Sequence, residues 1–187
     1  MRHAGFVLVG GRSSRMGRDK ALLPVEGVAL ARRIANQVQD TVGSAALIGN
    51  PALYGDLGFP VIPDQVPNCG PLGGIVTALG SSQADWNLIV ACDMPSIDAP
   101  LLRLLVNFTK RTQCDAIVPL GALGPQPLCA VYHGRCLSLF QRALADNRLK
   151  MKDLISDLRV HAVDGIDPAR FENLNSPADW SRYTHAQ

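Results

Sequence analysis

The residues best suited to chemistry gather near the N-terminus, in a stretch rich in glycine and positive charge. Its eleven positions hold three glycines and four cations, and they read Gly10-Gly11-Arg12-Ser13-Ser14-Arg15-Met16-Gly17-Arg18-Asp19-Lys20. Glycines let a backbone approach a ligand closely, while hydroxyl, amide N–H and cationic groups bind phosphate oxygens. A solvated basic loop with turn glycines would have the same composition. The position directly after the apolar run 6–9 favours phosphate binding, because ligands of α/β proteins bind beyond the carboxyl ends of strands.

The stretch matches neither of two common phosphate-binding signatures. A P-loop needs Gly-Lys followed by Ser or Thr, but Gly17 is followed by Arg18-Asp19-Lys20. The G-x-G-x-x-G turn of dinucleotide-binding proteins is absent as well. The sequence therefore predicts a phosphate-binding loop of another kind.

A second candidate is the acidic residue of Cys92-Asp93-Met94-Pro95, which follows the apolar run 86–91. A carboxylate in that position suits Mg²⁺, which takes one or two carboxylates and completes its shell with phosphate oxygens and water. Asp93 could equally cap a turn or a helix. Cys92 is interpreted as a packing residue and not as a nucleophile, since no histidine lies near it in the sequence.

Two further segments are weak candidates when each is taken alone. Residues 69–74, Cys69-Gly70-Pro71-Leu72-Gly73-Gly74, permit close backbone approach, and a helix N-terminus there would accept negative charge. Gly-Pro is also ordinary turn chemistry. Asn173 and Asn175 alternate so that both amides would lie on one side of an extended segment. Turn and cap chemistry before a last helix accounts for them equally well.

Alternating strands and helices would position these residues. Apolar runs predict strands at 6–9, 45–48, 61–62, 86–91, 116–118, 128–132 and 160–163. Helical spacing, caps and first-turn prolines predict helices beginning near residues 30, 71, 98, 136, 151 and 177. We expect residues 1–187 to form one α/β domain with a mostly parallel sheet.

Composition narrows the class of protein. The chain of 187 residues carries 18 Lys and Arg against 16 Asp and Glu, which argues against a nucleic-acid-binding protein. No apolar run approaches the roughly 20 residues of a membrane-spanning helix, and the first residues lack the pattern of a signal peptide. Five cysteines without a C-x-x-C pair indicate reduced thiols. We therefore expect a cytoplasmic protein whose partners include neither nucleic acid nor membrane.

Taken together, the candidate segments resemble the molybdenum cofactor guanylyltransferases, a family of nucleotidyltransferases. The run from Leu8 to Gly17, followed by Asp19-Lys20, looks like the family's signature loop. Later segments resemble its later motifs in the same order: Gly70-Pro71-Leu72 with Gly74, Cys92-Asp93-Met94-Pro95, Pro127-Leu128-Cys129-Ala130-Val131-Tyr132 and Asn173-Leu174-Asn175-Ser176-Pro177. The resemblance extends to about Trp180 and implies a single-domain, Rossmann-like, three-layer α/β/α fold of the nucleotide-diphospho-sugar transferase type.

The resemblance implies transfer of GMP from GTP to molybdopterin, which forms molybdopterin guanine dinucleotide and pyrophosphate. It implies that Arg15, Lys20 and Asp93 carry catalysis and that Asp93 is the ligand of Mg²⁺. Asn173 and Asn175 would lie toward the pterin phosphate or the metal. The nucleotide-binding residues implied are Leu8, Val9, Gly10, Gly11, Lys20, Asn50, Asp64, Gly70 and Asp93.

The chain departs from the family at Val9, where Ala is usual, and at Ser176, where Thr is usual. The family's base-contacting Asn falls on Asn50 or is replaced by Gly49. Rival functions are cytidylyl transfer to the same pterin, nucleotidyl transfer to a sugar or polyol phosphate, and a non-catalytic GTP-binding module. By resemblance, Gly10-Gly11 favours guanine. An acceptor as oxidation-prone as molybdopterin also suggests handover of the product to molybdoenzymes or other cofactor-biosynthesis proteins.

Overall fold

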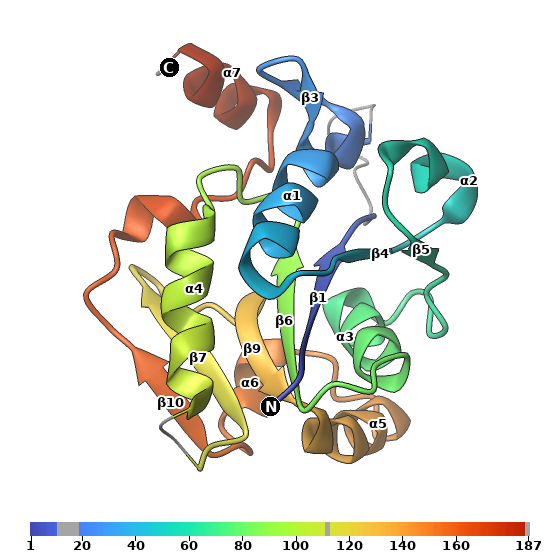
Figure 1. Ribbon diagram of the computed structural model, residues 1–187, viewed down its shortest axis with the longest axis vertical. Coiled ribbons are helices and arrows are strands. Elements are labelled where there is room, and N and C mark those ends of the chain that lie inside the picture. The colour runs from blue at the N-terminus through green and yellow to red at the C-terminus, as the bar shows by residue number, and fades with distance from the viewer. Residues whose placement is uncertain (11–18, 111–112, 186–187) are drawn as a thin grey trace.

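The main sheet runs through the middle of the molecule (Figure 1). The protein is described by a computed structural model that covers residues 1–10, 19–110 and 113–185. Within these residues the strands lie in the order β10-β7-β9-β6-β1-β4-β5, and β8 pairs with β7. The strands are β1 (His3–Leu8), β4 (Ala46–Ile48), β5 (Val61–Ile62), β6 (Trp86–Ala91), β7 (Ala116–Gly121), β8 (Gly124–Pro125), β9 (Cys129–His133) and β10 (Val160–Val163).

The sheet is mostly parallel, as the alternating pattern predicts. β1 pairs in parallel with β4 and with β6, β4 pairs so with β5, and β7 pairs so with β10. The exception is β9, which runs antiparallel to both of its neighbours, β6 and β7. The carboxyl ends of β1, β4, β5 and β6 therefore meet at one edge of the sheet.

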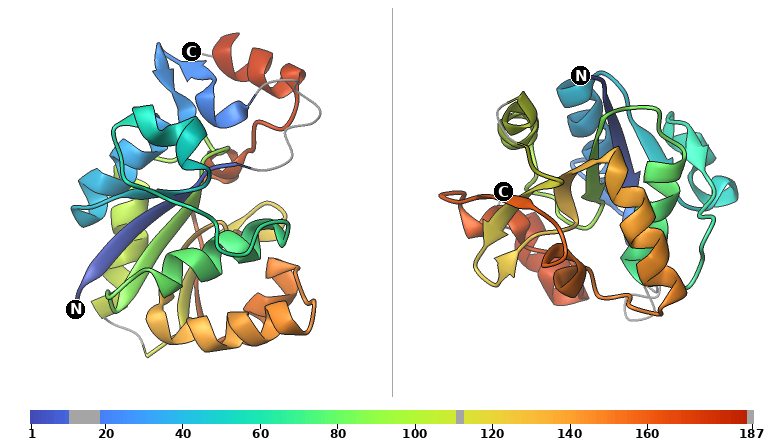
Figure 2. Two further views of the ribbon diagram at one scale, coloured as in Figure 1. Left: turned by 90° about the vertical axis from the view of Figure 1, so that its right-hand side faces the viewer. Right: turned by 90° about the horizontal axis from the view of Figure 1, so that it is seen from below.

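Helices cover both faces of the sheet (Figures 1 and 2), which confirms the three-layer fold. The helices α1 (Leu30–Val42) and α4 (Ala99–Asn107) pack on one face, against alternate strand residues such as Val7 and Leu88. The helices α3 (Gly70–Gly80) and α5 (Leu137–Ala145) pack on the other, against residues such as Phe6 and Ile89. Successive strand side chains point to opposite faces, so each strand contributes to two hydrophobic cores.

Local sequence signals account for the helix ends. At α4 the Asp98 side chain accepts a hydrogen bond from the backbone N–H of Leu101 at 3.0 Å, and Pro100 lies in the first turn. The last helix, α7 (Pro177–His185), begins with a reciprocal cap between Ser176 and Asp179, in which each side chain accepts the other's backbone N–H. None of the described helices has the length and apolarity to cross a membrane.

Several short elements differ from the predictions. The hairpin of β2 (Pro24–Val25) and β3 (Val28–Ala29), the helix α2 (Pro51–Tyr54) and the strand β8 are too short to produce a periodic pattern. The strand β1 begins at His3 instead of Phe6, because pairing with β6 extends it. The sequence also predicts a helix over 151–158, but the helix α6 spans only Met151–Ile155. The remaining elements are the short 3₁₀ helices η1 (Lys20–Leu22), η2 (Gly55–Leu57), η3 (Phe108–Lys110), η4 (Gly134–Cys136) and η5 (Pro168–Phe171).

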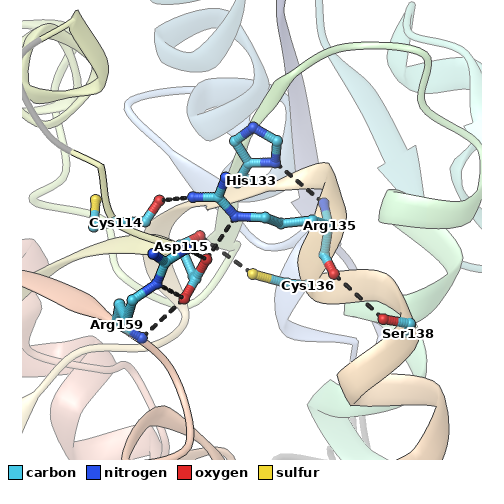
Figure 3. A network of polar contacts seen from close by, with 7 residues as sticks. All are labelled: Cys114, Asp115, His133, Arg135, Cys136, Ser138 and Arg159. Atoms are coloured by element: carbon cyan, nitrogen blue, oxygen red, sulfur yellow. Dashed lines mark hydrogen bonds and ion pairs between the residues drawn. The ribbon is translucent and has the colours of Figure 1, made fainter.

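Asp115 ties together three segments at the edge where β7 and β10 begin (Figure 3). Its carboxylate accepts hydrogen bonds from Arg135 at 2.5 Å, from the Arg159 guanidinium at 2.9 and 3.0 Å, and from the Arg159 backbone N–H at 3.0 Å. These hydrogen bonds, led by those of Arg159, hold the pKa of Asp115 well below its usual range. The network fastens the antiparallel β9 and the edge strand β10 to β7.

We expect Asp115→Asn to lower the free energy of unfolding at pH 7 by about 2 kcal/mol, as for hydrogen bonds to a charged group. Because the folded-state pKa of Asp115 is depressed, this contribution is present above the unfolded-state pKa and is lost as the pH falls through the folded one. Urea unfolding at pH 7 and at acidic pH measures both effects. Asp157→Asn is the control, since its ion pair with Arg148 is exposed and should contribute less than about 1 kcal/mol.

Candidate functional site

The site lies beyond the carboxyl ends of β1 and β6, which are paired up to Leu8 and Ala91. The backbone N–H of Cys92 still donates to the Leu8 carbonyl at 3.1 Å, so the chain segments after both strands start side by side. Gly10 and Asp93 are two residues beyond the paired strand ends. The sheet therefore brings the start of the glycine-rich stretch next to Asp93, as the sequence predicts.

The asparagines near the C-terminus join the same site. The backbone N–H of Leu174 donates to the Asp93 carbonyl at 2.9 Å, which places Asn173 and Asn175 on either side of this contact. The Lys20 ammonium donates to Asn175 Oδ1 at 2.8 Å across a sequence separation of 155 residues. Lys20, Asp93 and Asn175 thus come from three distant segments and meet in one place.

Charge and burial oppose each other at Asp93. Burial raises the pKa of its carboxyl group, and the positive charge of Lys20 pulls it back toward the charged form. A partly buried carboxylate beside one lysine is a suitable partner for a cation or for a cationic side chain. Cys92, its neighbour, is buried, and burial raises the pKa of the thiol to about 12. This confirms the interpretation of Cys92 as a packing residue, because a thiol of that pKa is not ionised at neutral pH.

Asp64 and Gly70 lie farther along the same edge, after β5. One carboxylate oxygen of Asp64 accepts hydrogen bonds from the Val66 backbone at 2.9 Å and from the Thr77 hydroxyl at 3.1 Å. These bonds attach the loop 64–69 to α3, which begins at Gly70 with φ of 61°. One oxygen of the Asp64 carboxylate therefore has a structural role within the loop.

Close packing of α3 against this loop requires glycine at position 73. A Cβ atom there would lie 2.3 Å from the carbonyl oxygen of Val66. We expect Gly73→Ala to displace the loop and to destabilise the fold by about 1 to 3 kcal/mol, as overpacking does. Gly80→Ala in the same helix is the matched control, because open space surrounds that position. Chemical denaturation of both variants should show a loss for the first and a change within about 0.5 kcal/mol for the second.

The segment after β4 shows why Val9, Gly49 and Asn50 are interdependent. A Cβ atom at Gly49 would lie 2.7 Å from Val9 Cγ2 and 2.9 Å from a ring carbon of Tyr54. Asn50 is exposed, and its Oδ1 accepts the backbone N–H of Ala52 at 3.0 Å, which caps α2. One of the two acceptor positions of the Asn50 oxygen is therefore used within the fold. Leu8 is half-buried against α3, while Gly11 and Arg15 lie outside the described residues.

A cavity of about 780 Å³ opens beside this site. Asn173 and Asn175 are both among its lining residues. Two exposed lysines, Lys150 and Lys152, line the cavity as well, and sequence reasoning did not identify them. No local pattern marks them, because the cavity walls come from segments 94, 122–128, 150–153 and 168–175.

Comparison with solved structures defines the class of fold. The structure is similar to molybdopterin-guanine dinucleotide biosynthesis protein A from Archaeoglobus fulgidus, with a TM-score of 0.82 and 22% identity over 98% of this chain and 97% of that one. It is also similar to a nucleotidyl transferase from Methanothermobacter, with a TM-score of 0.74 and 17% identity over 99% of this chain and 97% of that one. The molecule has the fold of the nucleotidyltransferases.

The family follows from the sequence comparisons. The family model of the MobA-like NTP transferase domain matches residues 5–162, and the chain belongs to this family. A protein of Pelotomaculum thermopropionicum described as a probable molybdenum cofactor guanylyltransferase is 35% identical over 184 residues, which cover 94% of this chain and 88% of the relative. These findings confirm the resemblance seen in the motifs, and the chain is a nucleotidyltransferase.

Proposed function

We propose that this enzyme transfers GMP from GTP to molybdopterin and releases pyrophosphate. The names of its relatives support this function. The observation that carries it is the contact between Lys20 and Asn175 beside Asp93. It joins the segment that would hold a triphosphate to the segment that would hold the acceptor, as the transfer of a nucleotidyl group between two substrates requires.

The nucleotide would occupy the edge between the segment after β1 and the start of α3. We assign the base to the surroundings of Leu8, Val9, Gly10 and Gly11, with Asn50 and Asp64 toward the nucleoside and Gly70 at the start of α3. Arg15 and Lys20 would hold the phosphates. The positive φ of Gly10, 102°, supports this assignment, because few other residues adopt such a backbone next to a ligand.

The acceptor would occupy the cavity of about 780 Å³ beside Lys20. Asn173 and Asn175 offer amide groups to a polar ligand, and the charged residues of the lining are Lys150, Lys152, Asp153 and Glu172, two of each sign. A cavity of this volume has room for a pterin with a terminal phosphate, and the polar groups of the lining would orient it. Its phosphate would reach the bound nucleotide from the side of Asn175.

The reaction needs positioning and charge neutralisation more than proton transfer. An oxygen of the acceptor phosphate bonds to the α-phosphorus of GTP, and the bond from that phosphorus to the departing pyrophosphate breaks. A phosphate monoester is largely ionised at neutral pH, so the nucleophile requires no general base. Lys20 and Arg15 would offset the repulsion between the two polyanions and hold them in line.

The side chains of this site are suited to one Mg²⁺ ion that binds the substrate phosphates as well as the protein. Among the described residues there is no group of three or more His, Cys, Asp or Glu side chains that could hold a metal by themselves. Asp93, partly buried and facing the charge of Lys20, fits an ion that takes its other ligands from phosphate oxygens and water. When bound there, Mg²⁺ would supply further positive charge to the phosphates. Asp93 would orient it.

We extend the proposal to the domain organisation of the chain, to its location in the cell and to the proteins that receive the product. Residues 1–187 would act as one nucleotidyltransferase domain, because the C-terminal segment completes the site through Leu174 and Asn175. All five cysteines lie within the described residues, none of them is in a disulfide and four are buried, which supports a reducing cytoplasmic location. The product would pass to molybdoenzymes or to other proteins of cofactor biosynthesis.

Pyrophosphate release tests the proposed function. Purified protein is incubated with Mg²⁺, molybdopterin and each nucleoside triphosphate in turn. Release with GTP alone supports guanylyl transfer, and release with CTP alone would make the enzyme a cytidylyltransferase. Release only when a sugar or polyol phosphate replaces the pterin would identify a different acceptor. Binding of GTP without any release would reduce the protein to a nucleotide-binding module.

A further inference from the structure

A buried tyrosine hydroxyl points at the residue next to Lys20. Tyr54 is 2% exposed, and its hydroxyl donates to Asp19 Oδ2 at 2.5 Å. The other carboxylate oxygen of Asp19 accepts the backbone N–H of Ala21 at 3.0 Å and caps η1. Asp19 therefore holds the first turn that carries Lys20, and Tyr54 holds Asp19.

The surroundings fix the ring of Tyr54 in this place. It is the last residue of the four-residue helix α2, whose start is capped by the Asn50 side chain. Gly49 leaves the room that the ring occupies, since a Cβ atom there would come within 2.9 Å of it. A Cβ atom at Gly10 would lie 3.6 Å from the Tyr54 hydroxyl, so this hydroxyl also underlies the start of the loop after β1.

The Tyr54 hydroxyl remains a hydrogen-bond donor at and around neutral pH. Burial and the bond to Asp19 raise the pKa of Tyr54 far above its ordinary value, so the group stays neutral. A neutral hydroxyl that donates to a carboxylate forms a charge-assisted hydrogen bond, which is stronger than a bond between neutral groups. The contact therefore restrains Asp19 and, with it, η1.

We propose that Tyr54 is a positioning residue that acts through Asp19 to hold Lys20 where it meets phosphate. The inference rests on the proposed function only in that Lys20 binds phosphate. Lys20 is then held from two sides: its side chain contacts Asn175, and its backbone turn is anchored through Asp19 to Tyr54. A ligand that draws the ammonium away from Asn175 meets a lysine whose main chain is already in place, which lowers the entropy lost on binding.

Tyr54→Phe removes the hydroxyl and keeps the ring. We expect its affinity for inorganic tripolyphosphate, measured by titration calorimetry with Mg²⁺, to fall about tenfold, as for the loss of one charge-assisted hydrogen bond. Thr109→Val is the control. Its hydroxyl is also buried and donates to the Val106 carbonyl at 2.7 Å, but it lies beside His3 at the start of β1, away from the carboxyl ends of the strands, so tripolyphosphate affinity should not change.

A double substitution distinguishes positioning from general loosening of the fold. Lys20→Ala should weaken tripolyphosphate binding, and adding Tyr54→Phe to it should cause no further loss, because the hydroxyl acts only through Lys20. Normal binding by Tyr54→Phe, equal losses in Tyr54→Phe and Thr109→Val, or additive losses in the double variant would each overturn the inference. In those cases Lys20→Ala still loses binding, and the proposed function stands. Undiminished binding by Lys20→Ala would refute the phosphate-binding role of Lys20 and the inference together.

Discussion

Replacing Asp93 with asparagine is expected to lower pyrophosphate release by on the order of a hundredfold or more, while the folded protein becomes at least as stable at pH 7. The first effect follows from the loss of the carboxylate that would orient Mg²⁺ at the phosphates. Asparagine keeps the shape of the side chain, so the carbonyl of residue 93 can still accept the N–H of Leu174. Initial rates with GTP and molybdopterin measure the loss.

The stability effect has the sign set by burial. Burial raises the pKa of Asp93 in the folded protein, even against the opposing charge of Lys20. A group with a raised folded-state pKa stabilises the fold below its unfolded-state pKa, and this contribution is lost as the pH rises through the folded-state value. At pH 7 the charged Asp93 therefore costs stability, and a neutral amide removes that cost. Without Mg²⁺ at pH 7, Asp93→Asn should unfold at a higher temperature than the original protein. In acid this difference between the two proteins should become smaller.

Asp98→Asn provides a control with the opposite sign, five residues along the chain. Burial works against the charge of Asp98, but hydrogen bonds from Arg170 and from the Leu101 backbone lower its pKa overall. The ion pair with Arg170 spans 2.6 Å and is partly exposed, so its loss should reduce stability at pH 7 by less than about 1 kcal/mol. Catalysis should remain. Full activity of Asp93→Asn would contradict the assignment of Asp93.

Replacing Lys20 with alanine is expected to lower turnover by on the order of a hundredfold or more, the scale found when a group that stabilises transition-state charge is removed. Lys20 is the described cation that contacts Asn175 and acts on Asp93, so its loss removes positive charge from the meeting point of the two substrates. The affinity for GTP should fall as well, because the lysine would bind phosphate before the reaction. Nucleotide titration and initial rates separate the two effects.

The control for this substitution is Lys110→Ala. Lys110 is exposed in η3, near His3 at the start of β1, and so lies away from the carboxyl ends of the strands. Both variants lose one positive charge, so a general dependence on net charge would affect them equally. Near-normal turnover by Lys20→Ala, or an equal loss in Lys110→Ala, would contradict the role of Lys20.

Local signals made much of the fold predictable. Helix α1 follows from Leu30, Ile34 and Val38 at helical spacing, and the starts of α4 and α7 follow from caps that operate within three residues. Apolar runs identify the buried strands, because parallel strands covered by helices on both faces need no polar residues. These signals are readable since each depends on neighbours a few positions apart.

The motifs were a partial guide to the site. Lys20, Asp93, Asn173 and Asn175 do come together, as their order and the strand ends indicate. Their chemical roles remain predictions, as do those of Asn50 and Asp64, each of which uses a side-chain oxygen within the fold. The support that Tyr54 provides to Asp19 was not predicted, because α2 is too short to show a pattern and the two residues are 35 positions apart.

The sequence by itself determined an α/β chain whose glycine-rich and basic stretch follows its first strand, with Asp93 at the end of another strand and two asparagines before the last helix. Only the tertiary structure decided which of these residues touch. The contact of Lys20 with Asn175 depends on β1 lying beside β6 and on Leu174 bonding to the carbonyl of Asp93. Strand order is set by how whole helices and strands pack together, and no local pattern encodes a contact across 155 residues.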